Sequence, residues 1–240
     1  MAAKVILLTH DTGDKDDRAS SWLSARGYEL LWTCPAEGGA LPALTDDIAG
    51  LVVYGGRFDI RDRELHPFLK TEMKFIEAAL SRDVPFLGLC LGGQLLAHVL
   101  GQPVGPHPMG HAEYGYYDLV PTSQGRAIFG EGLKVLQSHW HGWYDAPKGA
   151  IPLGGTACFP QQAFQYGETA FAFQFHPEAS RTMLATWIGR RPSERHLLPG
   201  AFPPARQLAD NLLYDRLLGE WFDTFLARWA RVRMLQEAAE

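Results

Sequence analysis

The 240-residue sequence predicts an α/β fold, a three-layer sandwich built around a central, mostly parallel β-sheet. In the first half, short and wholly apolar segments alternate with helix-length segments, the pattern of a parallel sheet covered on both faces. After residue 101, strand-like segments follow one another closely with Gly and Pro between them, which favours an antiparallel extension of the sheet. A long amphipathic segment near the end predicts a C-terminal helix.

The individual elements follow from local patterns. Continuous apolar runs in the first half predict strands at residues 4–9, 28–33, 48–54 and 85–89. Apolar residues at helical spacing predict helices at residues 16–27, 65–81 and 95–100. The second half carries strand-like segments at residues 114–120, 134–138, 157–166 and 169–175, followed by a helical pattern at 179–190.

The C-terminal part begins with a proline-rich segment at residues 192–206, which predicts a loop. The helical pattern at 208–235 has an apolar stripe formed by Leu212, Leu217, Trp221, Phe225, Trp229 and Val232. Its polar face mixes Asp, Glu and Arg, so we expect the stripe to pack on the core or on a partner rather than on a membrane. The chain has no internal repeat, and we expect one domain over residues 1–240, with a core at about 4–190 and a helical appendage at about 191–240.

Composition and charge exclude several classes of protein. Lys and Arg number 22 against 27 Asp and Glu, a formal charge of −5, which gives no general attraction to nucleic acid or to an anionic membrane. No apolar run approaches the roughly 18 residues of a membrane span, and the run at residues 5–8 is too short for a signal-peptide core. Cys34, Cys90 and Cys158 are too few and too scattered for a disulfide framework or a zinc knuckle. We therefore expect a soluble, cytoplasmic protein with neither a nucleic-acid nor a membrane partner.

A candidate nucleophile lies in residues 86–94, Phe-Leu-Gly-Leu-Cys-Leu-Gly-Gly-Gln, which predict a strand, a Gly-x-Cys-x-Gly turn around Cys90 and the start of a helix. The serine version of this turn is the nucleophile elbow of hydrolases, whose glycines allow the chain to double back sharply. Free N–H groups at a helix N-terminus stabilise a thiolate and can also hold an oxyanion. The alternative is a buried structural cysteine with glycines for tight packing.

A candidate base and acid follow another predicted strand, where Phe171-Ala-Phe-Gln-Phe175 ends in His176-Pro177-Glu178. A cysteine nucleophile needs a base, and a carboxylate that fixes the tautomer of an imidazole improves that base. The alternatives are a histidine satisfied at a strand end and an acid favoured at a helix N-terminus.

Together, the two segments resemble the paired signatures of the class I (triad-type) glutamine amidotransferases, and the separation 176 − 90 = 86 residues is typical of that domain. The resemblance covers about residues 4–190, and within the family it is to stand-alone members similar to the amidotransferase domain of GMP synthetase, which include γ-glutamyl hydrolases. It implies a flavodoxin-like core with Cys90 as nucleophile, His176 as general base and acid, and Glu178 as the partner that orients the histidine.

The resemblance also implies further site residues. Backbone N–H groups near Gly56 and at Leu91 would form the oxyanion hole, and Gln94 would lie beside bound glutamine. The alternatives are a plain turn glycine at Gly56 and a polar helix residue at Gln94. Residues 137–143, Gln-Ser-His-Trp-His-Gly-Trp, resemble the family's substrate-binding loop, which makes Ser138, His139 and Trp140 candidates. Trp143 replaces the usual acid of that loop, which could signal a ligand other than free glutamine, and the tryptophans could also belong to the core.

The expected chemistry is cysteine-dependent hydrolysis of the γ-glutamyl amide of glutamine or of a γ-glutamyl compound, through a γ-glutamyl thioester. No cofactor is expected, and no metal, because neither the pair His107 and His111 nor the pair His139 and His141 has a third ligand placed by a motif. The chain has no nucleotide-binding motif, so it is either an amidotransferase acting with a separate synthetase subunit or an independent hydrolase. The alternative from another class is a catalytically silent binding or stress-response module on the same fold.

Overall fold

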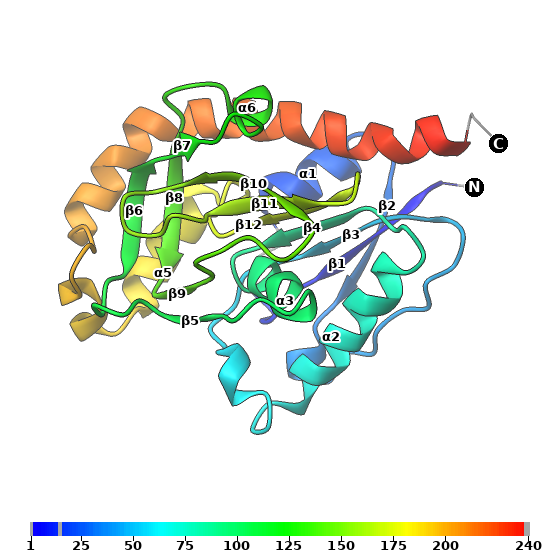
Figure 1. The fold of residues 1–240 in the computed structure, drawn as a ribbon, viewed down its shortest axis with the longest axis horizontal. Coiled ribbons are helices and arrows are strands. Elements are labelled where there is room, and N and C mark those ends of the chain that lie inside the picture. The colour runs from blue at the N-terminus through cyan, green and yellow to red at the C-terminus, as the bar shows by residue number, and fades with distance from the viewer. Residues whose placement is uncertain (1, 14–15, 238–240) are drawn as a thin grey trace.

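A computed structural model describes residues 2–13 and 16–237, with side chains through residue 230. Its centre is an eight-stranded sheet that crosses the molecule (Figure 1). The strands lie in the order β2 (Glu29–Thr33), β1 (Lys4–Leu8), β3 (Ile48–Val53), β4 (Phe86–Leu89), β12 (Ala170–Phe173), β11 (Ala163–Tyr166), β10 (Ala150–Gly155) and β7 (Val120–Pro121). Neighbours from β2 to β12 pair in parallel, whereas those from β12 to β7 pair antiparallel. A mostly parallel sheet with an antiparallel extension is what the sequence predicts.

Two small antiparallel pairs lie beyond this sheet. Strand β6 (Glu113–Asp118) pairs with β8 (Lys134–His139), and β5 (Gly105–Pro106) pairs with β9 (His141–Gly142). Both pairs lie on the left of Figure 1, near the end of the sheet that carries β7 and β10. They place the segment around Trp140 between β8 and β9.

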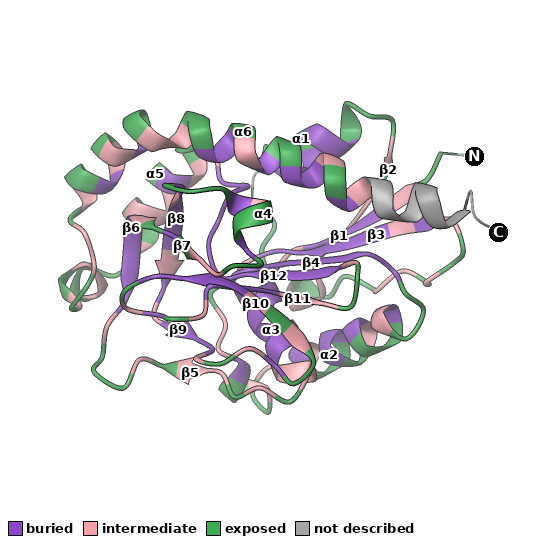
Figure 2. Ribbon diagram, turned by 45° about the horizontal axis from the view of Figure 1, so that its top comes forward, coloured by how far each residue is buried: buried purple, intermediate pink, exposed green. Residues whose placement is uncertain are grey.

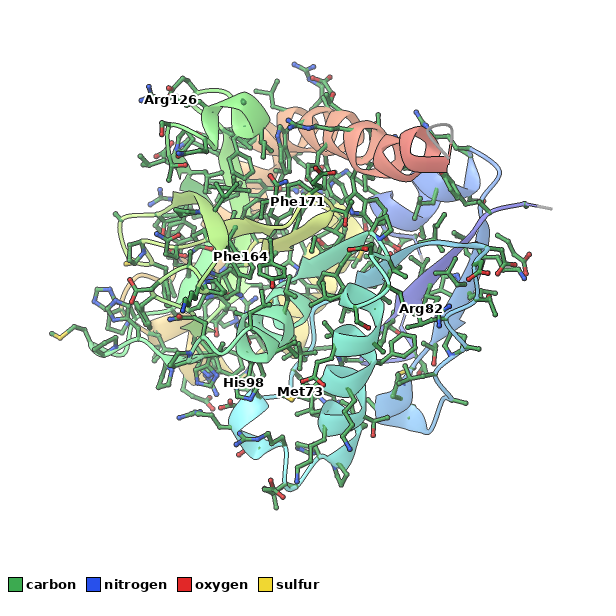
Figure 3. The ribbon with its side chains drawn as sticks, turned by 45° about the vertical axis from the view of Figure 1, so that its right-hand side comes forward. Met73, Arg82, His98, Arg126, Phe164 and Phe171 are labelled. Carbon is green, nitrogen blue, oxygen red and sulfur yellow. The ribbon has the colours of Figure 1, made fainter. Side chains whose placement is uncertain are left out.

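Helices cover both faces of the sheet. One apolar layer joins the sheet to α1 (Arg18–Ser24), α5 (Arg181–Arg190) and α6 (Pro204–Glu237), with the short α4 (Arg126–Phe129) at its edge. The other joins it to α2 (Pro67–Leu80) and α3 (Leu91–Val99). Phe171 and Phe164, on neighbouring strands, belong to the first and second layer respectively (Figure 3). This arrangement confirms the predicted three-layer sandwich.

The long helix α6 runs along one face of the sheet and buries an apolar stripe against it (Figures 1 and 2). The stripe is formed by Leu218, Phe222, Phe225, Leu226 and Trp229. Full burial of one such side chain contributes roughly 1.5–3 kcal/mol to stability, so this helix is held to the core by hydrophobic contact. The prediction was wrong for two members of the stripe, because Leu212 and Leu217 are 73% and 53% exposed. The side chain of Val232 lies outside the described residues.

The element boundaries differ from the prediction in the second half of the chain. Strand β10 was not predicted, because the Pro and Gly residues within it resemble a loop. The segment 157–166 becomes a strand only from Ala163, and the segment 114–120 is divided between β6 and β7. The proline-rich segment contains a 3-10 helix, η3 (Ser193–Leu197), and the first turn of α6. Two further 3-10 helices, η1 (Pro35–Glu37) and η2 (Ile60–Asp62), follow β2 and β3.

Within the described part of the chain, none of the helices combines the length and the hydropathy needed to cross a lipid bilayer.

Candidate active site

Cys90 occupies a strained turn between β4 and α3. Its backbone has φ 50° and ψ −106°, a left-handed conformation that costs a residue with a side chain of the order of 1–3 kcal/mol. Its N–H donates to Phe173 O at 2.7 Å, and the N–H of Gly92 donates to Tyr54 O at 3.2 Å, so the neighbouring strands hold the turn in place. The side chain is 6% exposed, at the N-terminus of α3. The structure thus has the geometry that the Gly-x-Cys-x-Gly pattern predicts.

His176 lies just after β12, the strand that pairs with β4, and its N–H is fixed by Leu136 O at 2.8 Å. Its ring nitrogen Nδ1 is 2.7 Å from Glu178 Oε1, and both side chains are buried. A carboxylate accepts hydrogen bonds, so Nδ1–H donates to Glu178 and the other ring nitrogen is left for the thiol. Gly55 lies against both partners, because a Cβ atom there would be 2.6 Å from His176 Cε1 and 3.3 Å from Cys90 Cβ.

The electrostatics of His176 favour its charged form. Burial by itself lowers the pKa of the imidazole, but the charges of Glu178 and Cys90 and hydrogen bonds to both residues outweigh burial and raise the pKa to about 10. The imidazole of His176 is therefore protonated at neutral pH, between the sulfur of Cys90 and the carboxyl group of Glu178. Such an imidazolium has a proton to give to a leaving group.

Gln174 is a residue of this site that sequence reasoning missed. Its amide Nε2 donates to Cys90 Sγ at 3.4 Å, and its Oε1 accepts from Gln94 Nε2 at 3.1 Å. Gln94 Nε2 also donates to His141 O at 3.0 Å. A chain of amides therefore orients an N–H toward the sulfur. Period-two alternation along a strand, which puts residues 174 and 176 on one face, is the signal that could have identified it.

The glycine loop after β3 brings Gly56 and Leu91 together, since a Cβ on Gly56 would be 3.0 Å from Leu91 Cδ2. Behind the loop, His10 Nδ1–H donates to Gly55 O at 3.0 Å, and its Nε2 is 3.0 Å from Glu72 Oε2. This buried pair was also missed from the sequence. Because His10 follows the end of β1, at the same edge of the sheet as Gly55 and Cys90, the parallel topology itself could have indicated it.

The predicted substrate-binding segment is only partly free to meet a ligand. Ser138 Oγ accepts from Arg191 Nη2 at 2.8 Å. The imidazole of His139 is 2% exposed, with Nδ1 bound to His141 O at 2.8 Å and Nε2 to Glu113 Oε2 at 3.0 Å, so it has a structural role. Trp140 is half-buried, with the guanidinium of Arg195 3.8 Å from its ring centroid.

Trp143, the residue that the loop resemblance aligns with an acid, belongs to the core. It is fully buried, with its ring centroid 5.4 Å from that of Phe164. The Trp143 side chain therefore packs in the core and adds no exposed aromatic surface.

The histidine pairs considered as metal ligands make other contacts. His107 and His111 stack with ring centroids 4.6 Å apart, and His111 Nδ1 lies 3.1 Å from Cys158 Sγ. Among the described side chains, those of residues 2–13 and 16–230, no three from His, Cys, Asp or Glu are grouped to hold a metal ion.

Comparison with known proteins shows the family of this chain. The sequence profile of the family described as Glutamine amidotransferase class-I matches residues 32–188, well over half of the chain. The glutamine amidotransferase-like protein YfeJ of Salmonella typhimurium is 32% identical over 186 residues, which cover 73% of this chain and 75% of that protein. The chain belongs to the class I glutamine amidotransferase family.

More distant relatives extend the comparison. The glutamine-hydrolysing GMP synthase of Porphyromonas gingivalis is 28% identical over 74% of this chain, but the match spans only 36% of that longer protein. The crystal structure of a glutamine amidotransferase from Thermotoga maritima superposes with a TM-score of 0.85 at 25% identity, covering 96% of this chain and 99% of that one. A glutamine amidotransferase from Methylobacillus flagellatus shares the fold, with a TM-score of 0.87 at 24% identity.

Proposed function

We propose that this protein hydrolyses the γ-glutamyl amide bond of glutamine or of a γ-glutamyl compound, with Cys90 as nucleophile. The observation that carries the proposal is the position of His176, whose ring lies between the Glu178 carboxylate at 2.7 Å and the Cys90 thiol in its strained turn. A cysteine, a base and a group that orients the base are the parts that nucleophilic catalysis requires.

In the first half of the reaction, the Cys90 thiolate attacks the γ-carbonyl carbon and a C–S bond forms. The carbonyl oxygen becomes an oxyanion, which the backbone N–H groups of Gly56 and Leu91 stabilise; one such donor is typically worth about 2.7–4 kcal/mol. His176 gives its proton to the departing nitrogen, the C–N bond breaks, and ammonia or an amine leaves. The enzyme then carries a γ-glutamyl thioester.

In the second half, His176 takes a proton from water and the resulting hydroxide attacks the thioester carbon. The C–S bond breaks, which releases glutamate and restores the thiolate. Glu178 keeps the imidazole in the required tautomer throughout, and Gln174 donates to the sulfur at both ends of the cycle. Gln94 would use its amide oxygen for the substrate, since its nitrogen is committed to His141 and Gln174.

The fate of the nitrogen defines two forms of this function. A separate synthetase subunit as partner is supported by the relatives named GMP synthase. The match with this chain spans only 36% of the Porphyromonas gingivalis protein, so the rest of that protein has no counterpart here. Independent hydrolysis needs no partner. Glutaminase activity that appears only when a synthetase is added would favour the first form, and activity of the purified chain alone the second.

The test is to incubate the purified protein with glutamine and a panel of γ-glutamyl amides, and to measure glutamate release and the acyl-thioester by mass spectrometry. We expect Cys90→Ala to abolish turnover and the thioester while the protein stays folded. Cys158→Ala, which changes a half-buried cysteine elsewhere, is the matched control and should keep full activity. Unchanged turnover in Cys90→Ala would remove the thiol from the reaction, whereas no glutamate release from any compound by the wild-type protein would favour the silent binding module.

A further inference from the structure

The buried pair of His10 and Glu72 has no part in the proposed chemistry but lies directly behind the glycine loop. His10 follows the end of β1 and is 2% exposed, and Glu72 lies on α2 and is fully buried. Their side chains meet with Nε2 of the imidazole 3.0 Å from Oε2 of the carboxyl group. The rings of Phe58 and Phe68 each have their centroid 6.4 Å from that of the imidazole. The pair is therefore enclosed by protein.

Glu72 is an unusual residue for its position in the fold. Its neighbours on the inner face of α2, Leu69, Met73 and Ile76, are apolar and buried. Among the described residues, its second oxygen Oε1 has no hydrogen-bond partner. A buried carboxyl group with an unpaired oxygen is costly, and an apolar residue could hold α2 to the sheet at least as well. The reason for the pair therefore has to be sought in what His10 contacts.

The second ring nitrogen of His10 holds the main chain of the glycine loop. Nδ1 lies 3.0 Å from Gly55 O, and since a carbonyl oxygen only accepts, Nδ1 carries a proton and donates. Gly55 lies beyond the end of β3, so a side chain rather than strand pairing supplies the donor for its carbonyl oxygen. Glu72 on the other ring nitrogen fixes the orientation of the imidazole that makes this bond.

Gly55 O and Gly56 N–H are the two ends of one peptide group. The described residues contain no cis peptide bond, so the oxygen and the N–H point in opposite directions across a planar group. Holding the oxygen therefore sets the direction of the N–H. A hydrogen bond at the oxygen also polarises the group, which makes the N–H at its other end a stronger donor.

Close contacts on both sides keep this peptide group in place. A Cβ atom on Gly56 would be 2.7 Å from His10 Cβ and 3.0 Å from Leu91 Cδ2. A Cβ atom on Gly55 would be 2.6 Å from His176 Cε1. Within the described part of the chain, neither the N–H of Gly56 nor that of Leu91 donates a main-chain hydrogen bond, so both are left for a ligand.

We infer that His10 is a positioning residue for the oxyanion hole, with Glu72 as the group that orients it. His10 holds Gly55 O, and through the peptide group it aims and polarises the N–H of Gly56. The inference rests on the proposed function, in which this N–H and that of Leu91 stabilise the oxyanion. It assigns a role in the reaction to two buried side chains that contact neither the sulfur nor His176.

A matched pair of variants separates the two bonds of the imidazole. The amide nitrogen of asparagine reaches about as far as Nδ1 of histidine, and that of glutamine about as far as Nε2. His10→Asn therefore keeps a donor for Gly55 O and loses the contact with Glu72, whereas His10→Gln keeps that contact and loses the donor for Gly55 O. The two variants should differ if the bond to the loop is the one that matters.

Steady-state kinetics compares them on glutamine or γ-glutamyl-p-nitroanilide, whichever the wild-type protein hydrolyses faster. Loss of an oxyanion donor typically lowers kcat about 10²–10³-fold, so loss of its support in His10→Gln should lower kcat about tenfold or more. KM should change little, because the oxyanion exists only in the transition state. His10→Asn should keep most of kcat, as should the control His98→Gln, in the last turn of α3 (Figure 3). Equal losses in the two His10 variants, or full activity of His10→Gln, would overturn the inference.

Alkylation of Cys90 by iodoacetamide separates positioning from a general structural effect. This reaction displaces iodide and forms no oxyanion, so His10→Gln should alkylate at the wild-type rate, measured by mass spectrometry of the peptide that contains Cys90. Parallel losses in alkylation and hydrolysis would mean that His10 only supports the folded turn, and the inference would be wrong.

Glu72 is tested by its own pair of variants. Glu72→Gln can donate to Nε2 and so leaves the proton of the imidazole on Nδ1, whereas Glu72→Leu leaves the ring without a partner. We expect kcat to fall in Glu72→Leu and to be largely kept in Glu72→Gln. Glu77→Gln, which changes an exposed carboxylate of the same helix, is the control. Full activity of Glu72→Leu would show that Glu72 does not orient the imidazole.

The amide of Gly56 reports on the peptide group without turnover. A hydrogen bond at the carbonyl oxygen withdraws electron density from the nitrogen, so the Gly56 amide nitrogen resonance should move upfield in His10→Gln and stay near its wild-type position in His10→Asn. An unmoved resonance in His10→Gln would overturn the inference. Failure of the proposed function gives a separate result: no γ-glutamyl compound would be hydrolysed, while the Gly56 resonance would still decide whether His10 polarises this peptide.

Discussion

Arg18 and Asp215 form an ion pair that links the C-terminal helix to the turn carrying Glu178. Arg18 Nη2 is 2.5 Å from Asp215 Oδ2, while Nη1 donates to Pro177 O at 3.1 Å and to Ala179 O at 2.6 Å. The main-chain N–H of Arg18 donates to Glu178 O at 2.9 Å. One arginine therefore satisfies the carbonyl groups of the whole turn, and α6 fixes that arginine.

Replacing Asp215 by Asn tests this link. The variant keeps the shape but loses the charge that fixes Arg18, so we expect a loss of roughly 1 kcal/mol in the free energy of unfolding and a lower kcat with little change in KM. Urea denaturation and steady-state kinetics are the measurements. Glu220→Gln removes an exposed pair with Arg216 on the same helix and should cost less than about 0.5 kcal/mol. An equal loss in both variants would mean that the link to the turn has no special role.

Glu178→Gln tests the orientation of His176. A glutamine side chain can fit the same space but carries no charge, so the imidazolium loses its carboxylate and the ring loses its preferred tautomer. We expect kcat to fall by roughly 10²–10⁴-fold and the pKa of His176 to decrease. NMR titration of the imidazole measures the pKa in the variant, and an unchanged value would show that Glu178 does not set it.

The raised pKa of His176 also predicts how stability depends on pH. In the folded protein the pKa is about 10, against 6.5 without the fold, so folding favours the protonated form. This contribution is fully present below about pH 6.5 and is lost as the pH rises toward 10. Urea denaturation at pH 6, 8 and 10 should therefore show stability falling with pH more steeply in the wild-type protein than in His176→Gln. Parallel curves for the two proteins would contradict this assignment.

Gly92→Ala tests the close packing of the turn. A Cβ at this position would be 2.0 Å from Val53 O, which belongs to backbone and cannot move aside easily. We expect a loss of about 3 kcal/mol or more in the free energy of unfolding, measured by urea denaturation. Gly189→Ala, in α5, has nothing within 4 Å and should instead stabilise the protein by about 0.5–1 kcal/mol. A tolerated Gly92→Ala would mean that the turn can relax.

Sequence patterns predicted the parallel half of the sheet because its strands are buried on both faces, as at Ile48–Val53. They failed at Ala150–Gly155, where Pro152 and two glycines interrupt the strand pattern, and at Leu212 and Leu217, where a stripe at helical spacing turned partly to solvent. That residues 1–240 form one domain stays a prediction, which the burial of Trp229 and Phe222 of α6 supports. The cytoplasmic location is likewise a prediction.

At the candidate site, motifs predict Cys90, His176 and Glu178, and the structure brings the three side chains together. Gln174 was missed because no motif marks it, although strand periodicity puts it on the same face as His176; its contact with Cys90 depends on the fold. Arg195 could not be identified, since its contact is with Trp140, which is distant in sequence. His139 is a different case. The loop pattern predicts a ligand contact at His139; burial and the hydrogen bond to Glu113 place its ring in the interior, so the prediction stays open only for its main chain.

Because α6 packs on apolar residues of the sheet, it limits how far the protein can be truncated at its C-terminus for expression. A truncated protein ending near residue 203 would expose to water the apolar residues that contact Phe222 and Trp229. It would also lack Asp215, which pairs with Arg18. Such a product would aggregate before it could be assayed, and its inactivity would say nothing about the thiol chemistry.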